Sequence, residues 1–478
     1  MDARGLAERL EKIKVSAPVA LAVIIFVALA RGLMEAALNN FEPSGTLGFT
    51  PLEDFIITAL DSVMFYLGVF LFFAAAQKLL LKKNYYAPLV LGLLLGLVPP
   101  VYDLVFTGNP SYFYTEPNVL FLDQGISAGE LIAVYGGIVL FALYIWARTE
   151  KMVKGVAALL AAWTSLQIMG SLLHYGSDVL SFWMMPDSEW MFGALFFVSR
   201  AILFLAPLAV MDRGFLDFLK YRASRIFLFL GLSVFSVSLF ETGPVETTLA
   251  FGASLFAYLL LFMTNRDEKE DRENARPDLK FQGMTWIVVL AGLLNGMVLL
   301  GLMGNPVLWI VIGLAALALV YNQPLNLKRN FPWAYIVEGI AFSAIMASYG
   351  AGEGNWIWSI GACFLTFAIG SAIKDYKDVE GDRKAGVRTA FTVLGKNRLK
   401  LFWDAFRVVL IIGPLAFIAV AQMEISLAQV ALWAGFAICA AYVLFFSRQK
   451  DREKVVDSYV WLFSALLLFS GIIFGILQ

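Results

Sequence analysis

An acidic run punctuated by glycine is the part of the sequence best suited to chemistry. It reads DYKDVEGDRKAG over residues 375–386 and places four carboxylates within eight positions, directly after an apolar segment long enough to cross a bilayer. Hard cations such as Mg²⁺ prefer oxygen ligands and often bind together with phosphate groups. The run therefore predicts a site at a membrane face that binds metal ions and a diphosphate.

A second acidic loop reads NRDEKEDRENARPD over residues 265–278. Asp267 and Asp271 are spaced i, i+4, which places both carboxylates on one face of a helix end, and Asp378 and Asp382 repeat that spacing. Two facing clusters could hold about two or three Mg²⁺ ions that clamp a diphosphate and neutralise its charge as it leaves. Four basic residues are candidates for direct contacts to the phosphate oxygens: Arg272, Lys328, Lys374 and Arg383. A solvated connector between transmembrane helices remains the alternative for the first loop.

The composition is that of an integral membrane protein. Of 478 residues, 60% are hydrophobic and only 15% are charged, whereas soluble domains carry about 25% charged residues. The net charge of −1 argues against a nucleic-acid-binding surface. One histidine and two widely separated cysteines provide neither a multi-histidine metal site nor a disulfide or zinc framework.

Apolar windows of roughly 17–25 residues predict about fifteen transmembrane helices. The first is expected to be retained rather than removed as a signal peptide. Alternate connecting segments lack lysine and arginine altogether: residues 39–55, 107–127, 175–190, 241–248, 350–356 and 422–426. By the positive-inside rule, the N-terminus and both acidic loops are cytoplasmic and the C-terminus lies outside.

The basic segment at residues 212–225 divides six predicted spans from nine. We therefore expect an all-α protein with a six-helix membrane domain over residues 1–223 and a nine-helix domain over residues 224–478. The first domain has no recognisable motif, but ionisable residues gather in its outer half: Arg31, Glu35, Asp61, Asp103, Glu130, His174, Asp178 and Arg200. They indicate either an outward-facing polar pocket or structural pairs and interfacial residues.

Three segments resemble the UbiA superfamily of intramembrane prenyltransferases. Residues 375–395, DYKDVEGDRKAGVRTAFTVLG, resemble its second aspartate-rich motif, and DRENARPD in the first loop resembles its first. The segment YNQPLNLKR, which begins at Tyr321, resembles the Tyr-Ser-x-Pro segment of that family. The resemblance covers about residues 224–478, and the nine spans predicted there equal the family's helix count.

The resemblance implies Mg²⁺-dependent ionisation of a prenyl diphosphate and transfer of the prenyl group to a hydrophobic acceptor in a cavity open to membrane lipid. By position, the implied metal ligands are Asp267, Asp271, Asp375, Asp378 and Asp382. Among these, Asp271, Asp378 and Asp382 are the expected catalytic residues. The implied diphosphate-binding residues are Asn265, Arg272, Lys328, Lys374 and Arg383.

The sequence departs from the family pattern at two positions. The asparagine of the first motif should fall at Met263, whereas Asn265 lies two residues later, and Asn326 stands where an arginine is usual. A transporter or lipid-binding protein with a catalytically inactive UbiA-like half is therefore the alternative function. The acceptor cannot be read from the sequence.

Overall fold

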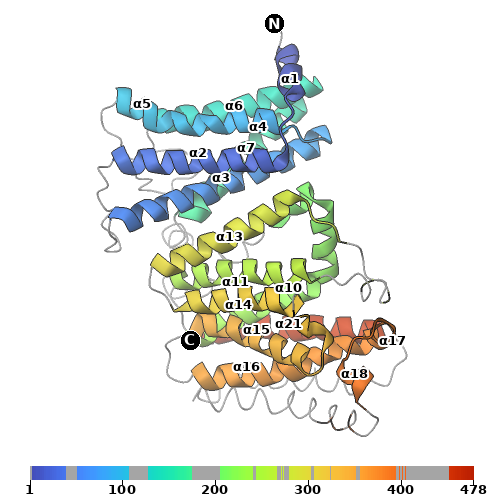
Figure 1. Cartoon of the computed structure of the whole chain (residues 1–478). Helices are drawn as coiled ribbons and strands as arrows, with labels where there is room; N and C mark the ends of the chain where they lie inside the picture. Colours follow the sequence, from blue (N-terminus) through green and yellow to red (C-terminus); the bar gives the residue numbers. More distant parts are fainter. Residues whose placement is uncertain are drawn as a thin grey trace. The chain divides into compact units, whose positions relative to one another are not determined.

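The computed structural model describes most of the chain as α-helix (Figure 1). The described residues are 3–38, 51–106, 128–174, 205–240, 244–265, 271, 273, 279–302, 306–322, 325–350, 356–394, 398, 401, 404 and 452–477. Within these residues there is no β-strand, only an isolated parallel bridge between Asn330 and Arg388. The predicted all-α class is confirmed for this part of the chain.

The described residues divide into two compact units. The first contains those of 1–185 and 199–217 together with 280–291, and the second contains those of 218–279 and 292–478. The boundary therefore falls within two helices, α10 (Arg213–Phe240) and α13 (Gly283–Leu302). The division into residues 1–223 and 224–478 remains a prediction.

Antiparallel packing of long apolar helices forms the first unit. Helix α2 packs on α3, and α3 and α6 both pack on α7 (Figure 1). Gly32 permits the close approach of α2 and α3, because a Cβ atom there would lie 2.9 Å from the Cα of Ala59. The helices of this unit are α1 (Ala3–Lys12), α2 (Ala17–Leu38), α3 (Pro51–Leu81), α4 (Tyr86–Leu93), η1 (Leu94–Leu97), α5 (Val98–Phe106), α6 (Ala128–Thr149) and α7 (Met152–His174).

One of the ionisable residues predicted in the outer half of this unit can be placed with its partner. Arg31 Nη1 donates a hydrogen bond of 2.7 Å to the hydroxyl of Tyr66, and the guanidinium lies 5.7 Å from the centre of that ring. The side chains of the other predicted ionisable residues lie outside the described part: Glu35, Asp61, Asp103, Glu130, His174, Asp178 and Arg200. The choice between a polar pocket and structural pairs therefore stays open.

The second unit contains the segments that resemble the prenyltransferases. Helix α15 packs on both α14 and α16, α11 packs on α14, and α17 contacts α18 and α21 (Figure 1). Gly339 allows α15 to approach α16, because a Cβ atom there would lie 2.8 Å from that of Ala368. Beside α10 and α13, its elements are α11 (Pro244–Thr264), α14 (Val307–Asn322), η2 (Leu327–Arg329), α15 (Trp333–Gly350), α16 (Trp356–Gly370), η3 (Ser371–Lys374), α17 (Asp375–Ala385), α18 (Ala390–Val393) and α21 (Arg452–Leu477).

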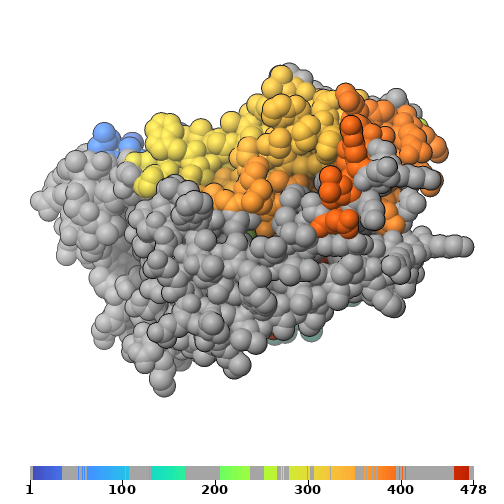
Figure 2. Space-filling model, turned by 90° about the horizontal axis from the view of Figure 1, so that it is seen from below, coloured from blue at the N-terminus to red at the C-terminus, as the bar shows by residue number. Residues whose placement is uncertain are grey.

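Large apolar side chains are exposed on helices of both units, as lipid-facing surfaces require. Phe26 on α2 is 70% exposed and Trp309 on α14 is 73% exposed. In the space-filling view, the gold-to-orange segments from α14 to α18 form one continuous surface (Figure 2). Exposed apolar residues in this part of the chain include Trp309, Leu319, Leu325, Trp333 and Leu365.

Helix length and composition agree with an integral membrane protein. Four described segments are long and apolar enough to span a bilayer: Ala17–Met34, Ser62–Leu81, Tyr86–Phe106 and Leu131–Thr149. Shorter apolar helices include Gly252–Thr264, Val307–Asn322 and Trp333–Tyr349. Three of the about fifteen apolar windows predicted to span the membrane, those centred near Val198, Ile412 and Phe436, lie outside the described residues. The count of fifteen spans and their orientation remain predictions.

Candidate active site

Helix α17 presents the acidic run as one helical face. Asp375, Asp378 and Asp382 are spaced i, i+3, i+7, which aligns their side chains along the helix. Asp375 and Asp378 lie in the first turn, where the helix dipole favours negative charge. Gly386 ends the helix with a φ of 78°, a left-handed conformation that glycine adopts without steric cost. Asp382 is buried, with only 2% of its surface exposed.

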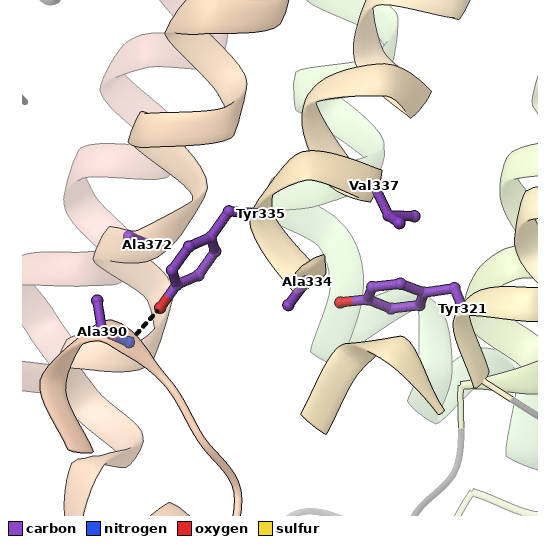
Figure 3. Close-up of a cluster of buried hydrophobic side chains, with 6 residues drawn as sticks. All are labelled: Tyr321, Ala334, Tyr335, Val337, Ala372 and Ala390. Atoms are coloured by element: carbon purple, nitrogen blue, oxygen red, sulfur yellow. Dashed lines mark hydrogen bonds between the residues drawn. The ribbon is translucent and has the colours of Figure 1, made fainter. Parts of the chain in front are cut away.

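Tyr335 ties the start of α17 to the start of α18. Its hydroxyl donates a hydrogen bond of 2.7 Å to Asp375 Oδ2. The same hydroxyl accepts a hydrogen bond of 2.9 Å from the backbone N–H of Ala390 (Figure 3). The ring is buried in an apolar cluster that includes Val337 and Ala372. A single side chain therefore fixes the direction of one carboxylate of the acidic face.

The loop before α15 is fastened to the segment that follows α17. The N–H of Phe331 donates to the carbonyl of Arg388 at 2.7 Å, and the N–H of Arg388 donates to the carbonyl of Arg329 at 2.9 Å. Asn326 has a φ of 51°, a left-handed conformation in which asparagine is enriched. These backbone contacts hold Lys328 near α17. Asn326 forms the turn that precedes Lys328.

A polar pocket of about 560 Å³, counting open space at its mouth, lies among these elements. Basic and acidic side chains share its wall, and α10, α17 and the Lys328 loop supply most of them. Anionic phosphate oxygens suit the basic groups, and metal ions suit the carboxylates. The lining residues with charged side chains are Arg222, Arg225, Lys328, Lys377, Asp375, Asp378 and Asp382.

An apolar pocket of about 1150 Å³, again counting open space, adjoins the polar one. Helices α11, α14, α15 and α16 supply most of its wall. Phe342 stacks on Phe367 with ring centres 4.2 Å apart, and Phe463 meets Phe367 edge to face at 5.8 Å. Three residues line both pockets, Arg225, Asn265 and Tyr321, so the polar and apolar spaces meet there. The apolar, aromatic wall suits an apolar chain.

The structure brings together five of the residues predicted for the site. Lys328 Nζ donates a hydrogen bond of 2.8 Å to Asn265 Oδ1, so the displaced asparagine still reaches the pocket directly after α11. All five line the polar pocket: Asn265, Lys328, Asp375, Asp378 and Asp382. Their roles as ligands remain proposals.

The other five predicted residues are not brought to this pocket by the described structure. Asp271 is half-buried and Arg383 is exposed, and neither lines the polar pocket. Asp267 and Arg272 lie outside the described residues, as does the side chain of Lys374. Of the two acidic clusters proposed to face each other, the structure therefore places only the one on α17 at the pocket.

The donor set fits Mg²⁺ bound together with a diphosphate. No group of three or more histidine, cysteine, aspartate or glutamate side chains close enough to hold a metal ion occurs among the described residues. Mg²⁺ does not need such a group, because it commonly uses one or two carboxylates, water and substrate phosphates. Asp375, Asp378 and Asp382 all line one pocket together with basic side chains, which meets that requirement.

Several pocket residues were missed by the sequence analysis. Arg222 and Arg225 are spaced i, i+3 on α10, a signal that could have placed both on one helix face. Glu338 on α15 lines the apolar pocket, and a lone acid in an apolar span is itself a signal of function. Tyr335 has no local signal, because its partners lie 40 and 55 residues away.

Comparison with known proteins bears out the resemblance in the C-terminal part. Residues 275–468 match the model of the UbiA prenyltransferase family. A curated relative, the lycopene elongase/hydratase of Haloarcula japonica, is 29% identical over an alignment of 208 positions that covers 37% of this chain and 67% of that protein. No solved structure matches. The UbiA match begins after Asn265 and Asp271, so it covers the Lys328 loop and α17 but only residues 275–278 of the first acidic loop.

Proposed function

We propose that this protein transfers a prenyl group from a prenyl diphosphate to a hydrophobic acceptor within the membrane, with Mg²⁺ as cofactor. One observation carries the proposal: a pocket lined by aspartate, arginine and lysine meets a large aromatic pocket at Arg225, Asn265 and Tyr321. An allylic diphosphate has a charged head and an apolar chain, which match these two spaces. The UbiA match supports prenyl transfer at the level of the family.

The residues of the polar pocket have distinct tasks in this proposal. Arg222, Arg225 and Lys328 bind phosphate oxygens. Asp375, Asp378 and Asp382 would hold Mg²⁺. When bound, Mg²⁺ neutralises the charge that develops on the leaving diphosphate. The aromatic side chains of Phe342 and Phe367 line the apolar pocket, where they would exclude water and stabilise a prenyl cation by cation–π attraction. Membrane lipid surrounds the unit and provides access for both apolar substrates.

The acceptor proposed for testing is lycopene, because the curated relative is named a lycopene elongase/hydratase. The apolar pocket is consistent with a hydrocarbon, since most of its wall consists of aliphatic and aromatic side chains. Lipid mass spectrometry of a host with and without the chain would identify donor and acceptor together. If the products derive from another acceptor, that acceptor replaces lycopene in the proposal, and the proposed reaction stays the same.

Isosteric variants of the acidic helix test the proposal directly. We expect Asp378→Asn and Asp382→Asn each to lower Mg²⁺-dependent release of diphosphate from an allylic donor by about 10²–10³-fold, because each loses a carboxylate for the metal. Removal of Mg²⁺ with EDTA should abolish release by the wild-type protein. The measurement is diphosphate formed per protein in detergent or nanodiscs.

Glu380→Gln is the matched control for these variants. Glu380 lies on the same helix but is exposed and does not line the polar pocket, so its activity should stay close to wild type. Full activity of both aspartate variants would refute the proposal. Binding of an allylic diphosphate without release, over the whole range of acceptors tried, would instead favour a lipid-binding or transport protein.

A further inference from the structure

Glu338 places a carboxyl group inside the apolar pocket. It lies on α15, one turn after Tyr335, and lines the pocket together with Phe342 and Ile345. Its Oε1 accepts a hydrogen bond of 2.6 Å from the hydroxyl of Tyr321. Taking a carboxyl group out of water is costly, so its presence in a membrane-embedded pocket calls for a function.

The position of Glu338 separates it from the diphosphate site. Among the described residues, Glu338 lines the apolar pocket but not the polar one, while Tyr321, only 5% exposed, lines both. Of the residues that line the apolar pocket, Glu338 provides the single carboxyl group. It therefore lies on the side where the prenyl chain and the acceptor are expected, and Tyr321 connects it to the charged side.

Prenyl transfer to an unsaturated carbon releases a proton that must be accepted. The bond between C1 of the donor and the diphosphate oxygen breaks, and its electron pair leaves with the diphosphate. The π electrons of an acceptor double bond then form a bond to C1 and leave a positive charge on the neighbouring carbon. Loss of a proton from the adjacent C–H bond restores a double bond, and a general base close to that carbon accelerates this loss.

We propose that Glu338 is the catalytic base that takes this proton, with Tyr321 as the residue that orients its carboxylate. The inference rests on the proposed prenyl transfer and extends it to the acceptor. A carboxylate in a low-dielectric pocket repels a negatively charged acceptor and stabilises a nearby carbocation. The pocket therefore selects a neutral acceptor with a reactive carbon–carbon double bond, rather than an aromatic carboxylate.

The experiment measures how much of the ionised donor couples to the acceptor and how much is captured by water. Wild type, Glu338→Gln, Glu338→Asp and the control Glu380→Gln are incubated with Mg²⁺, an allylic diphosphate labelled at C1 and lycopene, the acceptor proposed above. Diphosphate release, coupled product and the free prenyl alcohol formed by capture of water are each measured at one fixed pH.

In Glu338→Gln, we expect diphosphate release within about threefold of wild type but at least ~10-fold less coupled product per diphosphate, with more prenyl alcohol. Glu338→Asp should recover part of the coupling, because it retains a base. Glu380→Gln should match wild type.

Other outcomes decide against the inference at different levels. Wild-type coupling in Glu338→Gln would overturn the role of Glu338 and leave the proposed function standing. Equal loss of release and coupling, with Glu338→Asp no better, would show that Glu338 only supports the fold or substrate binding. If wild type released no diphosphate in the presence of Mg²⁺, the proposed function would fail, and the role of Glu338 with it.

Discussion

At the scale of single residues, the charged pocket depends on how its carboxylates are held as well as on their presence. Asp375 is the clearest case, because its partner Tyr335 lies on another helix and also binds the N–H of Ala390. A group that orients a metal-binding side chain typically changes metal affinity about 10–100-fold when it is removed. In the proposed site, Tyr335 is therefore a positioning residue for Asp375.

Removal of the Tyr335 hydroxyl tests whether it positions Asp375 for Mg²⁺ binding. We expect Tyr335→Phe to raise the Mg²⁺ concentration for half-maximal diphosphate release about tenfold, while activity at saturating Mg²⁺ falls much less. The reason is that Asp375 keeps its carboxylate but loses the donor that fixes its direction. Mg²⁺ titration of the purified variant is the measurement.

Tyr376→Phe is the matched control for this change. Tyr376 is the next residue after Asp375, and its ring packs against Phe391 at 5.5 Å between centres. Its Mg²⁺ dependence should resemble that of wild type. An unchanged Mg²⁺ requirement in Tyr335→Phe would show that Asp375 does not depend on this hydrogen bond.

At the scale of elements, helix starts are fixed by side chains that the acidic motifs do not include. Asp212, only 1% exposed, precedes α10, and its Oδ1 accepts a hydrogen bond of 2.9 Å from the N–H of Gly214. Its Oδ2 accepts hydrogen bonds from the N–H of Gln282 at 2.8 Å and from Thr285 Oγ1 at 2.6 Å. One carboxylate thus caps α10 and fastens the start of α13 to it.

Asp212→Ala should destabilise the protein by about 2–3 kcal/mol, because it removes a helix cap and leaves buried donors without an acceptor. The midpoint of thermal unfolding, followed by tryptophan fluorescence in detergent, measures the effect. Asp217→Ala is the control, since that side chain is 46% exposed and faces Arg213 at 3.9 Å. Equal midpoints for the two variants would contradict the role of Asp212.

Those features of the site that depend only on helical spacing could be predicted from the sequence. The aspartates of α17 could be placed on one face because 3.6 residues per turn aligns positions i, i+3 and i+7. The hydrogen bonds between Tyr335 and Asp375 and between Tyr321 and Glu338 could not be predicted in this way, because tertiary packing brings these residues together. Lys328 was proposed from its basic side chain and Asn265 through the resemblance, and their 2.8 Å contact needed the structure.

At the scale of the whole molecule, both pockets are built from residues of the second unit alone. The first unit is not needed to line them, and its function is not indicated by a described site. The alternation of loops with and without basic residues predicts one orientation in the membrane for the whole chain. The acidic helix should then face the cytoplasm, where soluble diphosphates and Mg²⁺ are available.

Cysteine labelling tests that orientation. In a chain with Cys363 and Cys439 replaced by alanine, Glu380→Cys should react only with a reagent that reaches the cytoplasmic face, because Glu380 is exposed on α17. Glu353→Cys, in the predicted outer loop at residues 350–356, should react with an impermeant maleimide added to intact cells. Labelling of Glu380→Cys from outside, or of both positions from the same side, would contradict the positive-inside assignment. Such a result would also place the polar pocket, which shares α17 with Glu380, on the outer face of the membrane.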